Sequence, residues 1–230
     1  MFSRFAEVCE AIAATTKKTE KVALLAAYLR ELQPGEGRLA AVFASGRCFP
    51  LAEERRLGVG GALLWRVLAG ITGADPQTLV ETYRKHGDTG ALAGELLAAR
   101  ESRGQTLKNV AARLAELAAA HGSSQKHPLL AQLLGNSSGL EAKYLVKIIT
   151  GDMRIGLQES LVEEAIAARF EAPVEQVQRA NLFLGDTGET LVLAAEGRLA
   201  EVHLRLFHPI GFMLASPRSE ERRVGKECRL

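Results

Sequence analysis

The stretch KYLVKIITGDMRIGLQESLV, residues 143–162, determines what we expect of the whole fold. Apolar residues recur at helical spacing on both sides of a central turn, at Tyr144, Leu145, Ile148 and Ile149 and again at Leu161, Val162, Ala165 and Ile166. Gly151 stands where the first helix would end in a left-handed residue. The stretch therefore predicts two helices joined by a short turn that contains Arg154 and Gly156.

The second predicted helix opens just after a glycine, and this arrangement suits the binding of an anion. The first N–H groups of a helix lack internal partners and carry a partial positive charge, and glycine has no side chain to keep an anion away. Lys143, Lys147 and Arg154 add cations nearby. These features are compatible with a phosphate site, although the same residues alone favour an ordinary joint between two helices.

The composition is typical of a helix-rich globular protein of 230 residues, with 47% hydrophobic and 24% charged residues. A net charge of only +2 does not indicate nucleic acid, so any binding of anions must depend on the local placement of charge. We expect a reducing cytoplasm, because the three cysteines are odd in number and far apart, at Cys9, Cys48 and Cys228. Neither a signal peptide nor a membrane-spanning run is recognised, so no membrane partner is expected.

Helical periodicity and helix-capping signals continue along the chain and predict an all-α fold of about ten to eleven helices. Asp75, Asp88 and Asp186 each precede a helical pattern and are interpreted as N-caps. Residues 123–126 are expected to form a polar loop, after which Pro128 would open a short helix.

An internal repeat is visible at an offset of 98 residues, where 57–90 align without a gap on 155–188, with 8 identities in 34 positions. Gly58 falls on Gly156, and both copies end in Gly-Asp-Thr-Gly. The repeat predicts pseudo-twofold symmetry. Two equivalent helix N-termini could each meet one of the antiparallel backbones of duplex DNA without reading its sequence. A duplicated helical unit whose glycines serve only capping and packing is an equally supported interpretation.

Motifs for covalent or metal chemistry are not found. Gly58-Val59-Gly60-Gly61 follows the charged segment 53–56, where a nucleotide-binding fold would need a buried strand, so we reject that interpretation. The five histidines are scattered and lack metal-ligand spacing. No catalytic or metal-binding residue is therefore assigned.

Several motifs together resemble the N-terminal DNA-binding domain of ATP-dependent DNA ligases. They are Gly46-Arg47-Cys48-Phe49-Pro50, Leu57-Gly58-Val59-Gly60, Gly87-Asp88-Thr89-Gly90, Lys143-Tyr144-Leu145-Val146-Lys147 and Gly151-Asp152-Met153-Arg154-Ile155-Gly156-Leu157. The likeness covers about residues 1–206. It implies an all-helical, pseudo-twofold, monomeric domain that lies on the minor groove opposite a nick and contacts phosphates on both sides.

The resemblance also implies which residues contact the DNA backbone, namely Arg47, Gly58, Gly60, Lys143, Lys147, Thr150, Gly151, Arg154 and Gly156. Glycine lets a phosphate approach the main chain, and the cations neutralise it. The full-length enzyme would seal nicks in repair, replication and recombination, with ATP and Mg²⁺ as cofactors and a sliding clamp as a candidate partner. No cofactor is expected in this chain.

The same resemblance divides the chain after residue 206. Residues 207–217 contain PIGFMLA, which looks like the family's lead into the adenylation domain. Because no Lys-x-Asp-Gly occurs, we expect the chain to lack the catalytic lysine and to seal nothing by itself. Residues 218–230, of which 8 in 13 are charged, look like a translated sequencing-library adapter and are expected to be disordered.

Two other functions remain open. A helical protein-interaction scaffold would show a large exposed apolar patch and indifference to DNA. A sequence-specific helix-turn-helix regulator would need a recognition helix rich in base-reading side chains. The helix after Gly156 offers Gln158, Glu159 and Ser160, a poor set for that task.

Overall fold

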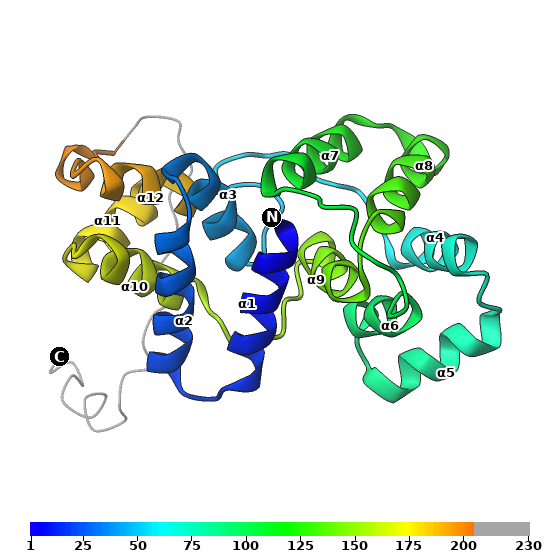
Figure 1. The fold of residues 1–230 in the computed structure, drawn as a ribbon. Coiled ribbons are helices and arrows are strands. Elements are labelled where there is room, and N and C mark those ends of the chain that lie inside the picture. Colours follow the sequence, from blue (N-terminus) through cyan, green and yellow to red (C-terminus); the bar gives the residue numbers. More distant parts are fainter. Residues whose placement is uncertain (205–230) are drawn as a thin grey trace, which may run out of the picture.

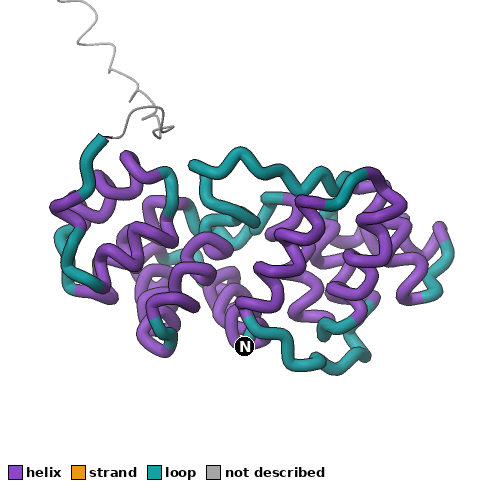
Figure 2. Tube along the Cα trace, turned by 90° about the horizontal axis from the view of Figure 1, so that it is seen from above, coloured by secondary structure: helices purple, strands orange, loops and turns teal. Residues whose placement is uncertain are grey.

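The computed structural model describes residues 1–204, and within them it is all helical (Figure 2). The elements are α1 (Phe2–Ala14), α2 (Lys18–Glu31), α3 (Pro34–Ala44), α4 (Gly61–Thr72), α5 (Pro76–His86), α6 (Thr89–Leu96), α7 (Leu107–Ala119), α8 (Gly122–Gly135), α9 (Gly139–Thr150), α10 (Glu159–Phe170), α11 (Val174–Leu184), α12 (Thr187–Ala195) and a 3-10 turn (Leu199–Glu201). The all-α prediction is confirmed, with 12 helices in this range. The predicted linker at 207–217 and tail at 218–230 lie outside the described residues.

The predicted caps form as the sequence indicates. The carboxylates of Asp75 and Asp88 accept hydrogen bonds of 2.8 Å from the first-turn N–H groups of α5 and α6, and Asp186 does the same for α12. Gly151 ends α9 in the left-handed conformation, with φ of 71°. These local signals fix where the helices of the repeated unit begin and end.

The start of α8 was predicted wrongly. Residues 123–126 are helical, and Pro128 lies inside α8 instead of opening it. Lys126 is only 8% exposed and donates a hydrogen bond from Nζ to the carbonyl of Leu57, so the segment carries a buried polar contact that its composition does not reveal. The bond that Pro128 cannot donate would go to the carbonyl of Ser124, an exposed residue in the first turn, where the loss is tolerated.

The twelve described helices form two halves of six that interlock. The first three helices of each half pack on the last three of the other half, in the pairs α2 with α10, α3 with α12, α8 with α4 and α9 with α6. In Figure 1 the loop that leaves α3 crosses the molecule toward α4, and the loop that leaves α9 crosses in the opposite direction toward α10. The predicted pseudo-twofold arrangement is therefore present, and the two halves exchange their first three helices, which pack against the other half.

A second register, which the sequence analysis missed, relates α1–α3 to α7–α9 at an offset of 105 residues. It pairs the buried positions Phe2, Phe5, Cys9 and Ile12 with Leu107, Val110, Leu114 and Leu117. Ten of 46 positions are identical between residues 1–46 and 106–151, and seven of these are alanine or leucine, so the match carries little weight in an Ala/Leu-rich chain. The offset falls from 105 before the crossing loops to 98 after them, so the segment from Gly46 to Gly58 is seven residues longer than the equivalent segment from Gly151 to Gly156.

The ends of α3 and α9 meet at the pseudo-twofold axis. A Cβ built on Gly46 would lie 4.0 Å from the carbonyl oxygen of Gly151, and one built on Gly151 would lie 3.9 Å from the carbonyl oxygen of Gly46. Such a reciprocal contact is expected where two equivalent segments pass an axis. Both crossing loops therefore start from the centre of the molecule.

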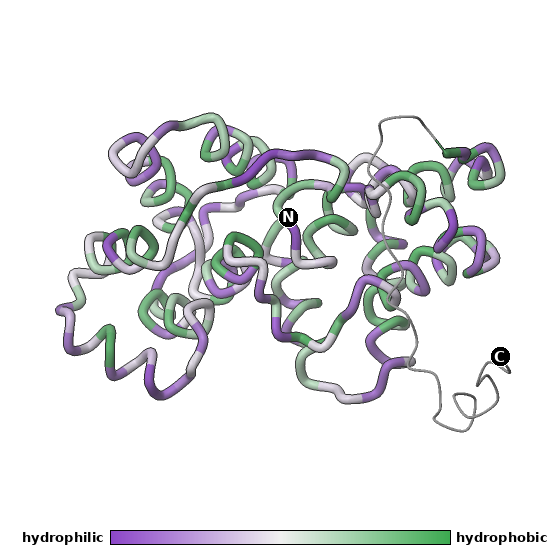
Figure 3. The backbone as a smooth tube through the Cα atoms, turned by 180° about the vertical axis from the view of Figure 1, so that it is seen from behind, coloured by the Kyte–Doolittle hydropathy of each residue, from purple (hydrophilic) through white to green (hydrophobic). Residues whose placement is uncertain are grey.

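Hydropathy follows the helical period along the chain, with green and purple stretches alternating along most helices (Figure 3). The apolar faces join in one core that runs through both halves. Within residues 1–204, no helix combines the length and the apolar character that a membrane crossing requires.

Candidate nucleic-acid interface

The two crossing loops end in equivalent junctions with the helices that follow them. Gly58 precedes α4 and Gly156 precedes α10, and their φ angles are 58° and 63°. Both glycines are exposed. Neither α4 nor α10 receives a side-chain cap at its N-terminus, so the first N–H groups of both helices are available to an external acceptor. The anion-binding geometry expected at Gly156 is thus built twice.

A buried lysine lies beside each of these glycines. Lys126 donates from Nζ to the carbonyl of Leu57, and Lys21 donates from Nζ to the carbonyl of Ile155. A Cβ added at Gly58 would lie 2.8 Å from Nζ of Lys126, and Gly156 has the same relation to Lys21, also at 2.8 Å. Glycine is therefore favoured at both positions by the left-handed backbone, and any side chain there would have to displace the ammonium group beside it.

These lysines are functional candidates that the sequence analysis did not identify. The exposed fraction is 5% for Lys21 and 8% for Lys126. The two residues are equivalent in the 105-residue register, in which Lys21 aligns on Lys126. That alignment was the signal that could have identified them.

Five of the predicted contact residues line one surface groove of about 940 Å³ between the first crossing loop and the end of α9. They are Arg47, Gly58, Gly60, Thr150 and Gly151. Arg55 and Arg56 line the same groove, and Arg55 lies over the ring of Phe49 at 4.3 Å from its centroid. The structure thus brings glycines, an uncapped helix end and several guanidinium groups together at the first loop.

Arg47 and Arg154 link each crossing loop to the other half of the molecule. Arg47 forms an ion pair of 3.2 Å with Glu159, in the first turn of α10. Arg154 has a φ of 48° and donates to the carbonyl of Gly87 at 2.7 Å, at the end of α5. Its side chain remains 53% exposed, so it is accessible to a ligand.

Lys147 is buried, whereas a direct contact with a DNA phosphate would need an exposed side chain. It is 4% exposed and forms an ion pair with Asp88, the N-cap of α6. Burial acts to raise the pKa of Asp88, but hydrogen bonds from Lys147 and from the N–H of Ala91 outweigh it and hold that pKa below its ordinary value. This placement gives Lys147 a role in the contact of α6 with α9, and its direct contact with phosphate stays a prediction.

Lys143 lies one turn earlier on α9 and is also engaged. Its Nζ is 2.6 Å from a carboxylate oxygen of Glu10, which also accepts a hydrogen bond of 2.8 Å from Tyr144. The side chain is 25% exposed. Lys143 and Lys147 therefore join α9 to its neighbours, whereas Arg47, Arg154 and the glycines lie on the crossing loops.

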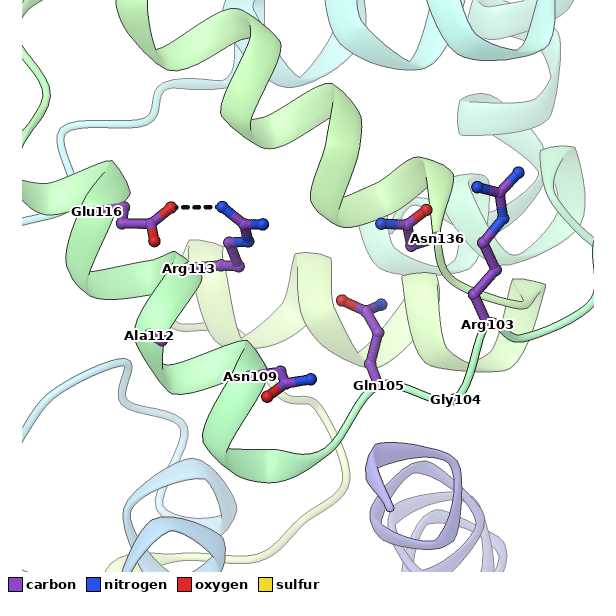
Figure 4. A pocket seen from close by; sticks show the side chains of 8 residues that line it. All are labelled: Arg103, Gly104, Gln105, Asn109, Ala112, Arg113, Glu116 and Asn136. Atoms are coloured by element: carbon purple, nitrogen blue, oxygen red, sulfur yellow. Dashed lines mark hydrogen bonds and ion pairs between the residues drawn. The ribbon is translucent and has the colours of Figure 1, made fainter.

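Another hollow, of about 560 Å³, lies between the start of α7 and the end of α8 (Figure 4). None of the predicted contact residues lines it. Arg113 is paired with Glu116 at 2.7 Å, and Gln105 donates to Ser137 at 2.8 Å. Because it is lined by none of the predicted contact residues, it adds nothing to the site on the crossing loops. Among residues 1–204, no cluster of His, Cys, Asp or Glu has an arrangement suited to holding a metal ion.

Comparison with known proteins decides the family. Residues 1–167 match the family model described as DNA ligase N terminus. The chain belongs to this DNA ligase N-terminal family. Its pseudo-twofold helical architecture and its crossing loops are thus features of a DNA ligase N-terminal domain.

Relatives in the family extend the match to nearly the whole chain. A protein of Koribacter versatilis named "Probable DNA ligase" is 50% identical over 214 residues, which cover 92% of this chain and 37% of that protein. A second "Probable DNA ligase", from Opitutus terrae, is 36% identical and covers 94% of this chain and 25% of its own length. The DNA ligase of Methanothrix thermoacetophila is 34% identical over 93% of this chain. The chain spans only 25% to 41% of the curated relatives it matches, so it corresponds to their N-terminal part.

Proposed function

We propose that this chain binds duplex DNA, nicked or intact, through its sugar–phosphate backbones without reading sequence. The observation that carries the proposal is the pair of equivalent loop–helix junctions at Gly58 and Gly156. Membership of the DNA ligase N-terminal family supports DNA as the ligand.

The geometry suits a partner that has twofold symmetry of its own. The two backbones of a duplex run antiparallel on either side of the minor groove, so two equivalent junctions on one monomer can each meet one strand. Backbone N–H groups and guanidinium groups bind phosphate oxygens, which carry no sequence information. Arg47 and Arg154 place guanidinium groups on the crossing loops, where Arg47 is paired with Glu159 and Arg154 with Asp152. A net charge of +2 is sufficient when the cations are placed locally.

The full-length enzyme is proposed to seal 3′-hydroxyl/5′-phosphate nicks in DNA repair, replication and recombination in the cytoplasm. ATP and Mg²⁺ would act in its adenylation domain, and a sliding clamp is a candidate partner. This chain contains no Lys-x-Asp-Gly, so we propose that it binds DNA but does not seal nicks by itself.

The scaffold alternative is less well supported. The large apolar side chains exposed in the described residues lie on separate segments, at Met1, Leu24, Leu51, Tyr83 and Leu204. A docking surface for a protein partner would gather such side chains in one patch.

Fluorescence anisotropy with labelled duplexes of unrelated sequence tests the proposal. We expect similar affinities for all sequences and a linear fall of log K with log salt concentration, because bound phosphates release counterions. Absence of binding at low salt would contradict the proposal and favour the scaffold. A strong preference for one duplex would favour a sequence-specific regulator.

A further inference from the structure

The two lysines beside the junction glycines are buried cations, and no carboxylate within residues 1–204 pairs with them. Lys21 hydrogen-bonds to the carbonyls of Ile12 and Ile155, and Lys126 to that of Leu57. Lys147 differs, because its buried ammonium is paired with Asp88. Buried charges in proteins are usually paired, since removing an ion from water without compensation is unfavourable. Within residues 1–204 the ammonium groups of Lys21 and Lys126 meet carbonyl oxygens but no anion, and this arrangement needs an explanation.

From this geometry we infer that Lys21 and Lys126 are the central cations of two equivalent phosphodiester sites, one at each crossing loop. The inference rests on the proposed DNA-binding function and names residues that the family resemblance did not supply. A phosphate at each site would accept hydrogen bonds from the backbone N–H groups that follow Gly58 or Gly156. The ammonium group of Lys126 or Lys21 beside that glycine would neutralise the phosphate charge.

Hydrogen-bonding capacity supports this assignment. An ammonium group has three N–H donors. In the part of the chain that the structure describes, Lys21 uses two of them on carbonyls and Lys126 uses one. Both therefore retain donor capacity next to an exposed glycine. In a partly buried site a cation interacts with an anion more strongly than it would in water, because the local dielectric constant is lower.

The equivalence of the two sites is independent support. A lysine that happened to be buried would not recur at the same position of the other half. Here three features recur in both halves: the lysine ammonium group, the carbonyl group that accepts its hydrogen bond, and the glycine beside it. They recur although α2 and α8 differ in most other residues. One duplicated element with two copies fits one duplex with two backbones.

A purely structural role, in which each lysine only fixes the turn through the carbonyl, predicts a different result. Such a lysine would affect stability and would weaken binding only through loss of the turn. Its removal would leave the number of neutralised phosphates unchanged. The salt dependence of binding separates the two roles, because it counts those phosphates.

The experiment compares the full chain with Lys21→Met, Lys126→Met and the double variant, in which methionine retains much of the aliphatic stem. Anisotropy titrations with one duplex at several salt concentrations give the slope of log K against log salt. The slope is negative, and we expect its magnitude to fall by about 0.9 in each single variant and by about 1.8 in the double variant. Leu130→Ala, one turn after Lys126 in the core, is the control that destabilises α8 without removing a charge, and its slope should equal that of the unmodified chain.

Two outcomes would overturn the inference while the proposed function survives. One is unchanged slopes in variants that are shown to be folded by circular dichroism. The other is the same loss of slope in Leu130→Ala. Absence of DNA binding by the unmodified chain would reject the proposed function itself. Should the variants fail to fold, ¹⁵N spectra of the lysine ammonium groups in the unmodified chain provide the test: DNA should shift two buried signals, and unshifted signals would reject the assignment.

Discussion

The buried Lys147 of α9 forms an ion pair with the half-buried Asp88, which is also the N-cap of α6. The exposed fractions of the two side chains are 6% and 13%. The residue that the family resemblance assigned to phosphate therefore connects two helices from different halves of the chain.

Replacing Lys147 with alanine should destabilise the fold by about 1.5–3 kcal/mol, because the half-buried carboxylate of Asp88 would keep its bond from Ala91 but lose its charged partner. Urea denaturation monitored by circular dichroism measures the change. Lys143→Ala is the control on the same helix: its side chain is 25% exposed, and we expect a loss of at most about 1 kcal/mol. Equal losses in the two variants would contradict the structural role of Lys147.

The same pair predicts a dependence of stability on pH. The pKa of Asp88 is held below its ordinary value in the folded state, so its carboxylate stabilises the fold above the unfolded pKa of about 4. That contribution is lost as the pH falls through the lower, folded value. We expect the free energy of unfolding to decrease below about pH 4, and Asp88→Asn to show a shallower decrease because it cannot titrate. Parallel pH profiles for both proteins would remove Asp88 from this role.

The sequence predicted the elements whose signals are local. Asp88, Asp186 and Gly151 act where capping chemistry places them, and the second copy of the glycine turn follows from the 98-residue register. It did not predict the helical start of α8, because Lys126 belongs to a polar segment and its burial depends on Leu57 in the other half. The exchange of halves was also hidden, since it arises from contacts between distant segments.

Lys147 shows the same limitation at the candidate site. A lysine close to a glycine turn has the same sequence signature whether it faces solvent or a carboxylate from another helix. Only the packing of α6 on α9 distinguishes the two cases. Arg154 could be assigned to an exposed position from the sequence because it lies in the turn itself.

Arg154→Ala should weaken DNA binding to a similar extent for every duplex tested and lower the salt slope by about 0.9. The reason is that its guanidinium group is 53% exposed on the second crossing loop, beside the junction at Gly156. Anisotropy titrations with three unrelated duplexes measure the effect. Arg4→Ala, which removes an arginine paired with Glu31, is the control and should retain the full slope. A loss of affinity for one sequence only would show that Arg154 reads bases.

The contacts of α6 with α9 and of α12 with α3 depend on glycines at equivalent positions. A Cβ on Gly90 would lie 2.7 Å from the carbonyl oxygen of Lys143, and one on Gly188 would lie 2.7 Å from that of Arg38. Both helices would have to move apart from rigid backbone, so Gly90→Ala and Gly188→Ala should each destabilise the fold by about 1–3 kcal/mol. Thermal and urea unfolding measure the losses.

Gly70→Ala is the matched control, because Gly70 lies inside α4 and a Cβ there meets no atom within 4 Å. In an open helical position alanine is favoured over glycine by up to about 1 kcal/mol, so this variant should be neutral or more stable. All three substitutions replace glycine with alanine in a helix, so they share the same change in helix propensity. A loss of stability at Gly90 and Gly188 but not at Gly70 would therefore be due to the close approach of the helices. Similar losses at Gly90 and Gly188 would follow from the pseudo-twofold axis, since each glycine meets the equivalent carbonyl of the opposite half. A stabilised Gly90→Ala or Gly188→Ala variant would show that the exchanged packing of the two halves is wrong at that interface.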